Sequence, residues 1–242
     1  MINQYMQKID KLLKQVTQDE AETMTKAAEN IATALQAGGV LHLFGSGHSH
    51  ILAEELYYRA GGLVPVNPIL HEPLMLHQGA VKSSELERQE NYAQEFMADQ
   101  DIRPEDVMIV ISTSGRNAVP VDVALYGKRK GAIVIAVTST EYSLSQPSRH
   151  SSGQRLLEVA DLILDTHIPQ GDALLSHEKI DVRFAPGSTV IGAAMLNAII
   201  AETIHLMMEA GAEPPIFLSA NVKGGDERNQ ALIEKYAKRV KM

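Results

Sequence analysis

Two short segments combine glycine with hydroxyl side chains where apolar runs of the sequence end. The first is Phe44-Gly45-Ser46-Gly47-His48-Ser49-His50, and the second is Ile111-Ser112-Thr113-Ser114-Gly115-Arg116-Asn117. Glycine lets a backbone approach a ligand closely, and serine and threonine offer hydroxyl donors. A helix that follows such a turn adds free N–H groups and a positive dipole end. Both segments therefore indicate contacts to an anionic ligand.

The first segment does not match the common nucleotide-binding patterns. Its spacing, G-x-G-x-S, lacks the third glycine of the dinucleotide fingerprint, and no acidic residue ends a second strand to contact a ribose. The lysine of a Walker-type phosphate loop is also absent. The alternative for this segment taken alone is a tight turn between a strand and a helix, with no ligand.

Acid–base chemistry would need carboxylates or imidazoles near those segments. His71 and Glu72 follow the second apolar run, and the alternative for them is a solvated loop pair. Glu202 and His205 lie three residues apart in a long apolar segment, so they can meet on one helix face. The alternative for this second pair is a structural Glu–His pair in the core.

The sequence predicts no metal site. It contains no cysteine, which excludes disulfides, thiolate metal ligands and a cysteine nucleophile. Glu202-x-x-His205 resembles half of a carboxylate-bridged metal site, but that architecture needs two such motifs. The remaining histidines show no ligand spacing with a second histidine: His77, His150, His167 and His177.

Alternating apolar runs and helical patterns must position these side chains. The short apolar runs cover Val40–Phe44, Leu63–Val66, Val107–Ile111, Ala132–Val137 and Leu162–Leu164. The helical patterns cover Ile51–Ala60, part of Ser84–Ala98, Val119–Lys130 and Ser188–Glu209. This alternation, with right-handed crossovers, predicts an α/β fold in three α-β-α layers around a parallel sheet. Because ligands bind beyond the carboxyl ends of such strands, both glycine–serine segments can face one pocket.

The first 37 residues precede the strand pattern. Their apolar residues recur three and four apart, as on one face of a helix, and such a stripe needs a partner surface. That surface is either the main domain or a second subunit. We therefore expect a helical segment over residues 1–37 and the α/β domain over residues 38–242. The segment lacks the three short helices and the basic face of a DNA-binding helix-turn-helix.

Composition narrows the class of protein. The chain has 242 residues, with 22 Lys and Arg against 30 Asp and Glu, and hence a formal charge of −8. This acidic balance disfavours nucleic-acid binding. No apolar run approaches the roughly 18–20 residues that span a bilayer, and the N-terminus lacks a signal-peptide pattern. We expect a cytoplasmic protein without a membrane or nucleic-acid partner.

Taken together, the two segments resemble the SIS (sugar isomerase) domain family. That family's signature is similar to G-x-G-x-S after the first strand, then S-x-S-G-x, a helix, and a strand ending in Thr. The match here is ISTSGRNAVPVDVALYGKRKGAIVIAVTST over residues 111–140. The resemblance covers about Ile31 to Gly211. Including SANVKGGDERN at 219–229, the chain is similar to an SIS subfamily of bacteria labelled phosphoheptose isomerase-like.

The resemblance implies a five-stranded flavodoxin-like sandwich with added N- and C-terminal helices, in a homodimer or homotetramer. It implies a sugar phosphate ligand and aldose–ketose isomerisation or related chemistry beside a carbonyl. The alternative is a non-catalytic phosphosugar sensor that acts through protein partners. No cofactor is expected. The implied substrate-binding residues are Ser46, Gly47, His48, Ser49, Ser112, Thr113, Ser114 and Asn117, and the catalytic candidates are Glu72, His71 and Glu202. Arg116 departs from the family pattern and could supply a cation.

Overall fold

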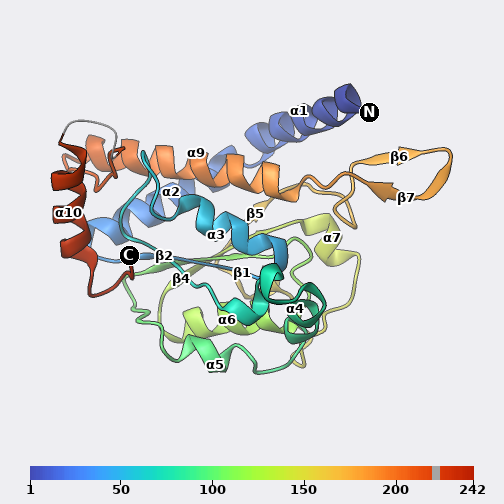
Figure 1. Cartoon of the computed structure of the whole chain (residues 1–242), viewed down its shortest axis with the longest axis horizontal. Coiled ribbons are helices and arrows are strands. Elements are labelled where there is room, and N and C mark those ends of the chain that lie inside the picture. Colours follow the sequence, from blue (N-terminus) through green and yellow to red (C-terminus); the bar gives the residue numbers. More distant parts are fainter. Residues whose placement is uncertain (220–223) are drawn as a thin grey trace.

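A five-stranded parallel sheet forms the centre of the computed structural model, which describes residues 1–219 and 224–242. Each strand pairs in parallel with its neighbours, in the order β2-β1-β3-β4-β5. The predicted fold class, a three-layer α/β sandwich, is confirmed (Figure 1). The strands are β1 (Leu41–Gly45), β2 (Val66–Pro68), β3 (Val107–Ile111), β4 (Ile133–Thr138) and β5 (Leu162–Asp165).

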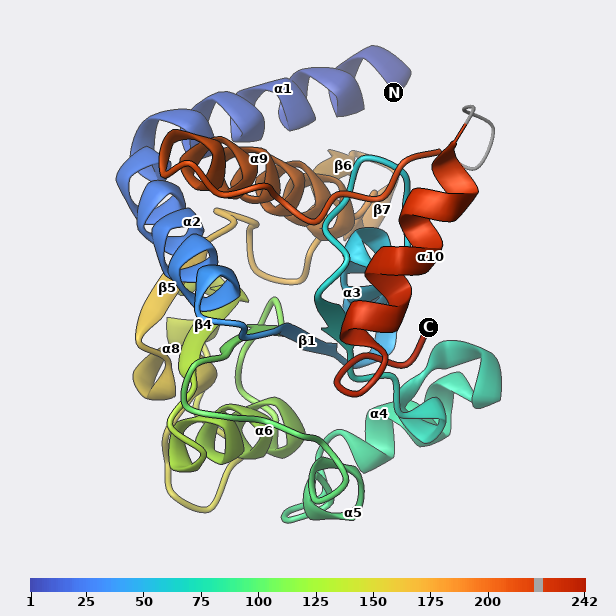
Figure 2. The ribbon, with the colours of Figure 1, turned by 90° about the vertical axis from the view of Figure 1, so that its left-hand side faces the viewer.

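Helices cover both faces of the sheet, as Figure 2 shows from the side. One layer contains α1 (Ile2–Asp19), α2 (Ala21–Gln36), α3 (His50–Leu56) and α9 (Ser188–Glu209). The other layer contains α4 (Ala80–Leu86), α5 (Gln94–Met97), α6 (Ala118–Arg129) and α8 (Leu156–Val159). Two more helices are α7 (Thr140–Leu144) and α10 (Gly225–Tyr236), and short 3-10 turns are η1 (Gly47–Ser49), η2 (Glu72–Leu74) and η3 (Leu76–Gln78).

The central strand β3 is apolar throughout because both of its faces are covered. Successive residues of a strand point to opposite faces. In β3, Val107, Ile109 and Ile111 belong to the core shared with α2 and α9, whereas Met108 and Val110 belong to the core shared with α6. All five are buried. This two-sided burial explains a continuous apolar run in place of polar–apolar alternation.

The apolar stripe of the first 37 residues packs on the main body of the chain. Ala27, Ala28 and Ile31 of α2 are fully buried in the same core as Leu196 of α9. The apolar face of α1 joins that core with Ile9, Leu12 and Val16.

Two features differ from the sequence prediction. The run predicted as the second strand, Leu63–Val66, mostly precedes β2, because Leu63 instead forms an antiparallel bridge with Ile216. A hairpin of β6 (Leu175–His177) and β7 (Ile180–Phe184) was not predicted, and it projects beyond the sheet (Figure 1). Part of the 219–229 pattern, residues 220–223, lies outside the described residues.

Among the described residues, α9 is the one helix whose length and apolar composition would allow it to cross a membrane. It is not a continuous apolar run of that length, because Asn197, Glu202 and His205 lie within it. A single such helix is weak evidence for a membrane span, because core helices of soluble proteins have the same properties. In this structure α9 packs against α1, α2 and α3.

A buried carboxylate joins distant parts of the chain at the edge of the sheet where the strands begin. The side chain of Asp106 has no solvent exposure. Its Oδ1 accepts a hydrogen bond from the Val40 backbone N–H at 2.8 Å. Its Oδ2 accepts from the Arg103 backbone N–H at 2.8 Å, from Arg239 Nη2 at 2.6 Å and from His42 Nε2 at 3.1 Å. The starts of β1 and β3 and the segment after α10 therefore share one anion.

The hydrogen bonds decide the charge state of this group. Burial alone would raise the pKa of Asp106, but the bonds from His42 and from the Val40 and Arg103 backbone hold that pKa below its ordinary value. Asn67 Nδ2 donates to His42 Nδ1 at 3.0 Å, which places the ring proton on Nε2, facing the carboxylate. The carboxylate is thus ionised and fully partnered.

Replacing Asp106 with Asn should lower the free energy of unfolding by about 3–5 kcal/mol, because the substitution leaves Arg239 without its buried counter-charge. Urea denaturation measures this loss. Asp101→Asn is the matched control, because Asp101 also pairs with Arg239 but has a side chain that is 46% exposed. This variant should lose less than about 1 kcal/mol of unfolding free energy. Equal losses in the two variants would contradict the assigned role of Asp106.

The loss should also depend on pH. Because the folded-state pKa of Asp106 is depressed, its carboxylate stabilises the fold above the unfolded value of about 3.9. That contribution disappears as the pH falls through the folded-state pKa. The difference in unfolding free energy between the wild type and Asp106→Asn should therefore change by no more than about 0.1 kcal/mol between pH 5 and 7. It should shrink below about pH 4.

Candidate functional site

The first glycine–serine loop leaves β1 through a tight turn. Glycine is required at Gly45, because a Cβ there would lie 2.5 Å from both the carbonyl carbon and the oxygen of Ser49. The Ser49 N–H donates to the Ser46 carbonyl at 3.0 Å, which closes the 3-10 turn η1. The turn leads directly into α3, so the loop passes from a strand end to a helix start, as predicted.

The side chains of this loop differ in their availability. Ser46 is buried, Gly47 and Ser49 are half-buried, and His48 is exposed. His50 Nδ1 is hydrogen-bonded to the Gly47 carbonyl, so this imidazole fixes the turn. His48, rather than His50, is therefore the histidine of this loop that a ligand can reach.

The second glycine–serine loop follows β3 and rests on the end of β4. The Gly115 N–H donates to Ser112 Oγ at 3.2 Å, and the Thr113 carbonyl accepts from the Ser139 N–H at 3.0 Å and from Thr138 Oγ1 at 3.2 Å. Gly115 has a φ of +56°, and a Cβ there would lie 3.1 Å from Thr138 Oγ1. The loop is thus held in one conformation before any ligand arrives.

Strand pairing brings the two loops together. β1 and β3 are neighbours, and their register pairs Gly45 with Ile111. Ser46 and Ser112 are the next residues on the two strands, and both are buried. Adjacent strands lie about 4.8 Å apart. The two serines therefore start their loops side by side at the carboxyl edge of the sheet, the edge where the strands end.

Two arginines flank the second loop. The Arg149 backbone N–H donates to the Arg116 carbonyl at 2.8 Å, and Arg149 Nη1 donates to Asn117 Oδ1 at 3.1 Å. Arg116 donates from Nε to the Pro147 carbonyl at 3.0 Å and from Nη1 to Gln146 Oε1 at 3.3 Å. These acceptors are all neutral. Asn117 is the residue that precedes α6, so both cations lie at the N-terminal end of that helix.

Neither arginine is neutralised within the described part of the chain. Arg116 and Arg149 each lack a carboxylate oxygen within ion-pairing distance among residues 1–219 and 224–242. Burial lowers the pKa of Arg149, and the positive charges of Arg116 and Arg88 lower that pKa further. The loop therefore carries two cations without an ion-pair partner although the whole chain is acidic, and the negative charge of Glu87 partly opposes the lowering of the Arg149 pKa. The sequence motif includes Arg116 but gives no sign of Arg149, which lies 32 positions beyond Asn117 in a segment without regular structure.

The catalytic candidates His71 and Glu72 have different surroundings. His71 Nε2 lies 2.8 Å from the Tyr92 hydroxyl, and the ring stacks on Phe96 with centroids 4.5 Å apart. Burial lowers the pKa of His71, which favours the neutral ring. Glu72 is exposed and accepts only a long hydrogen bond, 3.4 Å, from Gln78 Nε2 within the described residues.

The segment that carries Glu72 lies against the first loop. Glu72 begins η2, which contacts η3, and α4 contacts η1 of the first loop. Leu76 of η3 lies over Gly47, because a Cβ on that glycine would be 3.9 Å from Leu76 Cδ2. The segment that begins at Glu72 thus packs against the first loop through η3 and α4, and the Glu72 side chain is exposed to solvent.

Glu202 is not brought to the two loops within one chain. It is half-buried in the second half of α9, and His205 is exposed. An ion pair between the two is absent from the described contacts, so the alternative of a Glu–His core pair is not seen. Asn197, one turn earlier, already donates to Glu55 Oε1 at 2.9 Å near the end of α3. From there α9 runs on toward α10, away from the carboxyl edge (Figure 1).

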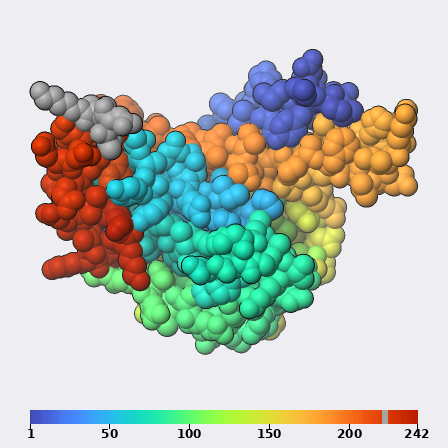
Figure 3. All heavy atoms as spheres, viewed as in Figure 1, coloured from blue at the N-terminus to red at the C-terminus, as the bar shows by residue number. Residues whose placement is uncertain are grey.

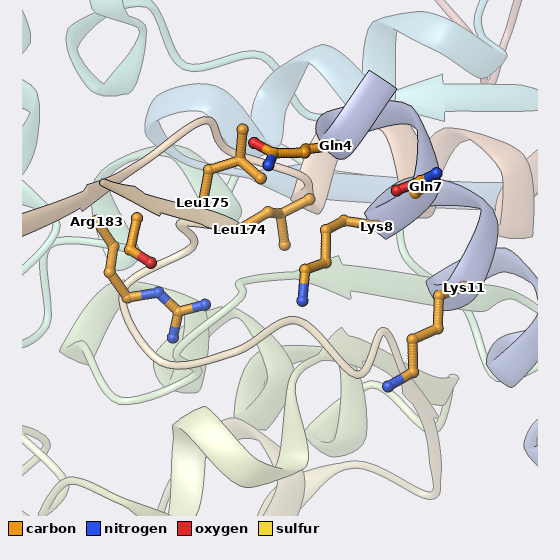
Figure 4. A pocket seen from close by; sticks show the side chains of 8 residues that line it. Gln4, Gln7, Lys8, Lys11, Leu174, Leu175 and Arg183 are labelled. Carbon is orange, nitrogen blue, oxygen red and sulfur yellow. The ribbon is translucent and has the colours of Figure 1, made fainter. Parts of the chain in front are cut away.

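A separate basic hollow lies between α1 and the β6–β7 hairpin. Its volume is about 450 Å³, and Lys8, Lys11 and Arg183 line it together with glutamine and leucine side chains. Figure 4 shows the two lysines on one face of α1 and Arg183 on the opposite wall. Neither glycine–serine loop contributes to its lining.

Known proteins resemble this chain in sequence and in fold. A sequence model described as SIS domain matches residues 4–139. A UPF0309 protein of Halalkalibacterium halodurans is 59% identical over 240 residues, covering 99% of this chain and 96% of the relative. A UPF0309 protein of Geobacillus kaustophilus is 60% identical over 240 residues, with the same shares covered.

Solved structures share the fold at low sequence identity. A phosphoheptose isomerase from Francisella tularensis has a TM-score of 0.54 at 17% identity, covering 84% of this chain and 96% of that one. The phosphoheptose isomerase from Neisseria gonorrhoeae has a TM-score of 0.53 at 14% identity, covering 83% and 97%. The resemblance inferred from the two glycine–serine loops is confirmed: the chain belongs to the SIS domain family, among its UPF0309 proteins.

Proposed function

We propose that this protein binds a sugar phosphate, with the phosphate group on the loop of residues 112–117. The observation that carries the proposal is the pair of guanidinium groups, Arg116 and Arg149, whose partners are neutral oxygens. Ser112 and Ser114 add hydroxyl donors, and α6 adds the positive end of its dipole. Charge-assisted hydrogen bonds of this kind favour a dianionic phosphate.

The first loop would contact the sugar. Ser46 and Ser112 follow paired residues of adjacent strands, so a ligand on the second loop extends over the first. Ser46, Ser49 and the Gly47 backbone can bond sugar hydroxyls, and the exposed His48 can donate a proton to the ring oxygen when the sugar opens.

We further propose that the reaction is aldose–ketose isomerisation with Glu72 as the base. The reaction removes a proton from the carbon beside the carbonyl and returns it to the neighbouring carbon, and a carboxylate suits this transfer. Glu72 is exposed beside the first loop, whereas His71 is neutral and bonded to Tyr92. His71 therefore positions the segment that carries Glu72.

The second candidate function is a phosphosugar sensor without catalysis. It is favoured by the positions of His71 and Glu202, one within an aromatic cluster and the other on a distant part of α9. These positions leave Glu72 as the one proposed catalytic carboxylate beside the loops of a single chain. Binding and catalysis must therefore be tested separately.

We also propose that the chain forms a homodimer, or a homotetramer built from it, through the hairpin and α1. Val182 and Ile180 on the hairpin are 68% and 47% exposed, and Ile2 and Met6 on α1 are 82% and 59% exposed. These elements lie at the same end of the molecule (Figure 3). A two-stranded hairpin is marginally stable alone, and exposed apolar patches favour protein contacts.

For ligand binding, aldose and ketose phosphates should raise the melting temperature of the wild type in a thermal-shift titration. Arg149→Gln should weaken the apparent affinity about 10- to 100-fold, because a charge-assisted hydrogen bond contributes roughly 1.5–3 kcal/mol. Ser112→Ala with Ser114→Ala should abolish the shift. Arg129→Gln, the same change at the other end of α6, should bind normally. The proposal fails if no sugar phosphate stabilises the wild type, or if the two arginine variants behave alike.

For catalysis, the best-binding sugar phosphate incubated with the protein in deuterated water should acquire deuterium beside its carbonyl. Glu72→Gln should slow this exchange about 10²- to 10⁴-fold, the usual contribution of a general base. Glu202→Gln is the control and should exchange at the wild-type rate. Tight binding without exchange would establish the sensor instead, and full exchange by Glu72→Gln would remove Glu72 as the base.

For assembly, light scattering should give the wild type the mass of at least two chains. Val182→Asp should reduce that mass to one chain, because it places a charge in the proposed contact. Val81→Asp, at a residue 75% exposed on α4, is the control and should leave the mass unchanged. A wild type that is monomeric at micromolar concentration contradicts the proposal.

A further inference from the structure

Three side chains with metal-binding atoms meet beside the second loop. Glu90 comes from the segment between α4 and α5, Asp122 from α6, and His150 from the segment between α7 and α8. His150 Nε2 lies 3.1 Å from Asp122 Oδ1 and 3.8 Å from Glu90 Oε2. One ligand atom from each residue lies within 4.8 Å of the other two.

These distances suit a small divalent cation. Zinc binds nitrogen and oxygen at about 2.0–2.2 Å, so two tetrahedral ligands lie about 3.3–3.6 Å apart. The observed separations of 3.1 and 3.8 Å lie on either side of that range. The His150 and Asp122 side chains are only 7% and 17% exposed, and that of Glu90 is 37% exposed. The group is therefore a partly enclosed set of one nitrogen and two oxygen donors.

Each of the three ligands is also held by an outer partner. Glu90 accepts from Ser151 through the backbone N–H at 2.7 Å and through Oγ at 3.0 Å. Asp122 Oδ2 accepts from the Asn91 N–H at 3.0 Å, which leaves Oδ1 directed at His150. Ser152 holds His150 Nδ1 in two ways: its backbone N–H donates to Nδ1 at 3.1 Å, and its Oγ lies 2.7 Å from Nδ1. Outer hydrogen bonds of this kind orient the ligands of metal sites.

We propose that Glu90, Asp122 and His150 bind a divalent transition-metal ion of the Zn²⁺ class, with solvent completing the coordination. Without the ion, His150 Nδ1 accepts the Ser152 N–H at 3.1 Å, so the ring proton lies on Nε2 and faces Asp122. When the ion takes Nε2, that proton shifts to Nδ1 and is donated to Ser152 Oγ in place of the Ser152 N–H contact. Two carboxylates and one neutral imidazole neutralise the dication. Residue spacing does not predict this site, because His150 and Asp122 lie 28 positions apart in the sequence.

The bound ion would also restrict the position of Arg149 beside the second loop. His150 follows Arg149, whose guanidinium contacts Asn117 and whose backbone contacts Arg116. Binding of the ion joins this segment to α6 and to the segment before α5, and so restricts Arg149 to a position beside residues 112–117. This second step rests on the proposed phosphate site, whereas the metal site itself does not.

The experiment is a Zn²⁺ titration of the chelator-treated full chain against a competing metal indicator. The wild type should bind one equivalent. His150→Ala, and Glu90→Gln as a milder variant at a more exposed ligand, should weaken binding at least about 10-fold. His177→Ala, which removes an exposed histidine of the hairpin, is the control and should bind like the wild type. Equal binding by His150→Ala and the wild type would overturn the site, as would no Zn²⁺ bound by the wild type.

A second measurement, the affinity for a sugar phosphate, distinguishes Zn²⁺ binding from its proposed effect on Arg149. With Zn²⁺, the thermal-shift affinity of the wild type for a sugar phosphate should exceed that of the metal-free protein, and Glu90→Gln should show no such difference. Zn²⁺ binding that leaves this affinity unchanged would overturn the restriction of Arg149 and keep the metal site. Failure of all sugar phosphates to bind would refute the proposed function, while the indicator titration would still decide the metal site.

Discussion

The order of the strands, β2-β1-β3-β4-β5, is the constraint on which the candidate site depends. The chain begins at an inner strand, moves outward to β2, and returns to the other side of β1 before continuing. Right-handed crossovers then place the connections after β1 and after β3 on opposite layers. Their first residues stay side by side at the carboxyl edge, because Gly45 pairs with Ile111. Ligands in open α/β sheets bind at this kind of reversal.

Charged side chains have different surroundings at the two ends of the strands. Where the strands begin, the buried charge of Asp106 is matched by the half-buried Arg239 and by backbone donors, so it contributes to stability. Where the strands end, Arg116 and Arg149 have only neutral partners. The overall charge of −8 therefore says little about the ligand, because a few cations on one loop set the local field.

The strands and helices whose apolar residues recur regularly in the sequence were predicted with bounds close to those observed. The runs at β1, β3 and β4 are buried on both faces, the edge run at β5 is partly buried, and the helix at Ser188–Glu209 was predicted with the bounds observed. The hairpin had a signal as well, because Ile180, Val182 and Phe184 alternate with charged residues, but the run is short and exposed. The two glycine–serine loops were recognised because glycine and hydroxyl residues stand at strand ends.

Contacts between distant residues could not be predicted in this way. Arg149 reaches Asn117 across 32 positions, and His150 reaches Asp122 across 28, in each case from a segment with no periodic pattern. The difference between His71 and Glu72 depends on Tyr92 and Phe96, which come from a later helix and loop. Neighbouring residues in the sequence therefore gave no indication of which of the two would be free.

The pairing of Arg239 with Asp106 also has a consequence for the order of folding during synthesis. The two residues are 133 positions apart, so a ribosome working at about 5–20 residues per second makes Arg239 roughly 7–27 s after Asp106. Until then the Asp106 carboxylate lacks the cation that accompanies its burial. In the nascent chain, the edge of the sheet where the strands begin would therefore stay in contact with water. That edge would be the last part of the sheet to become buried.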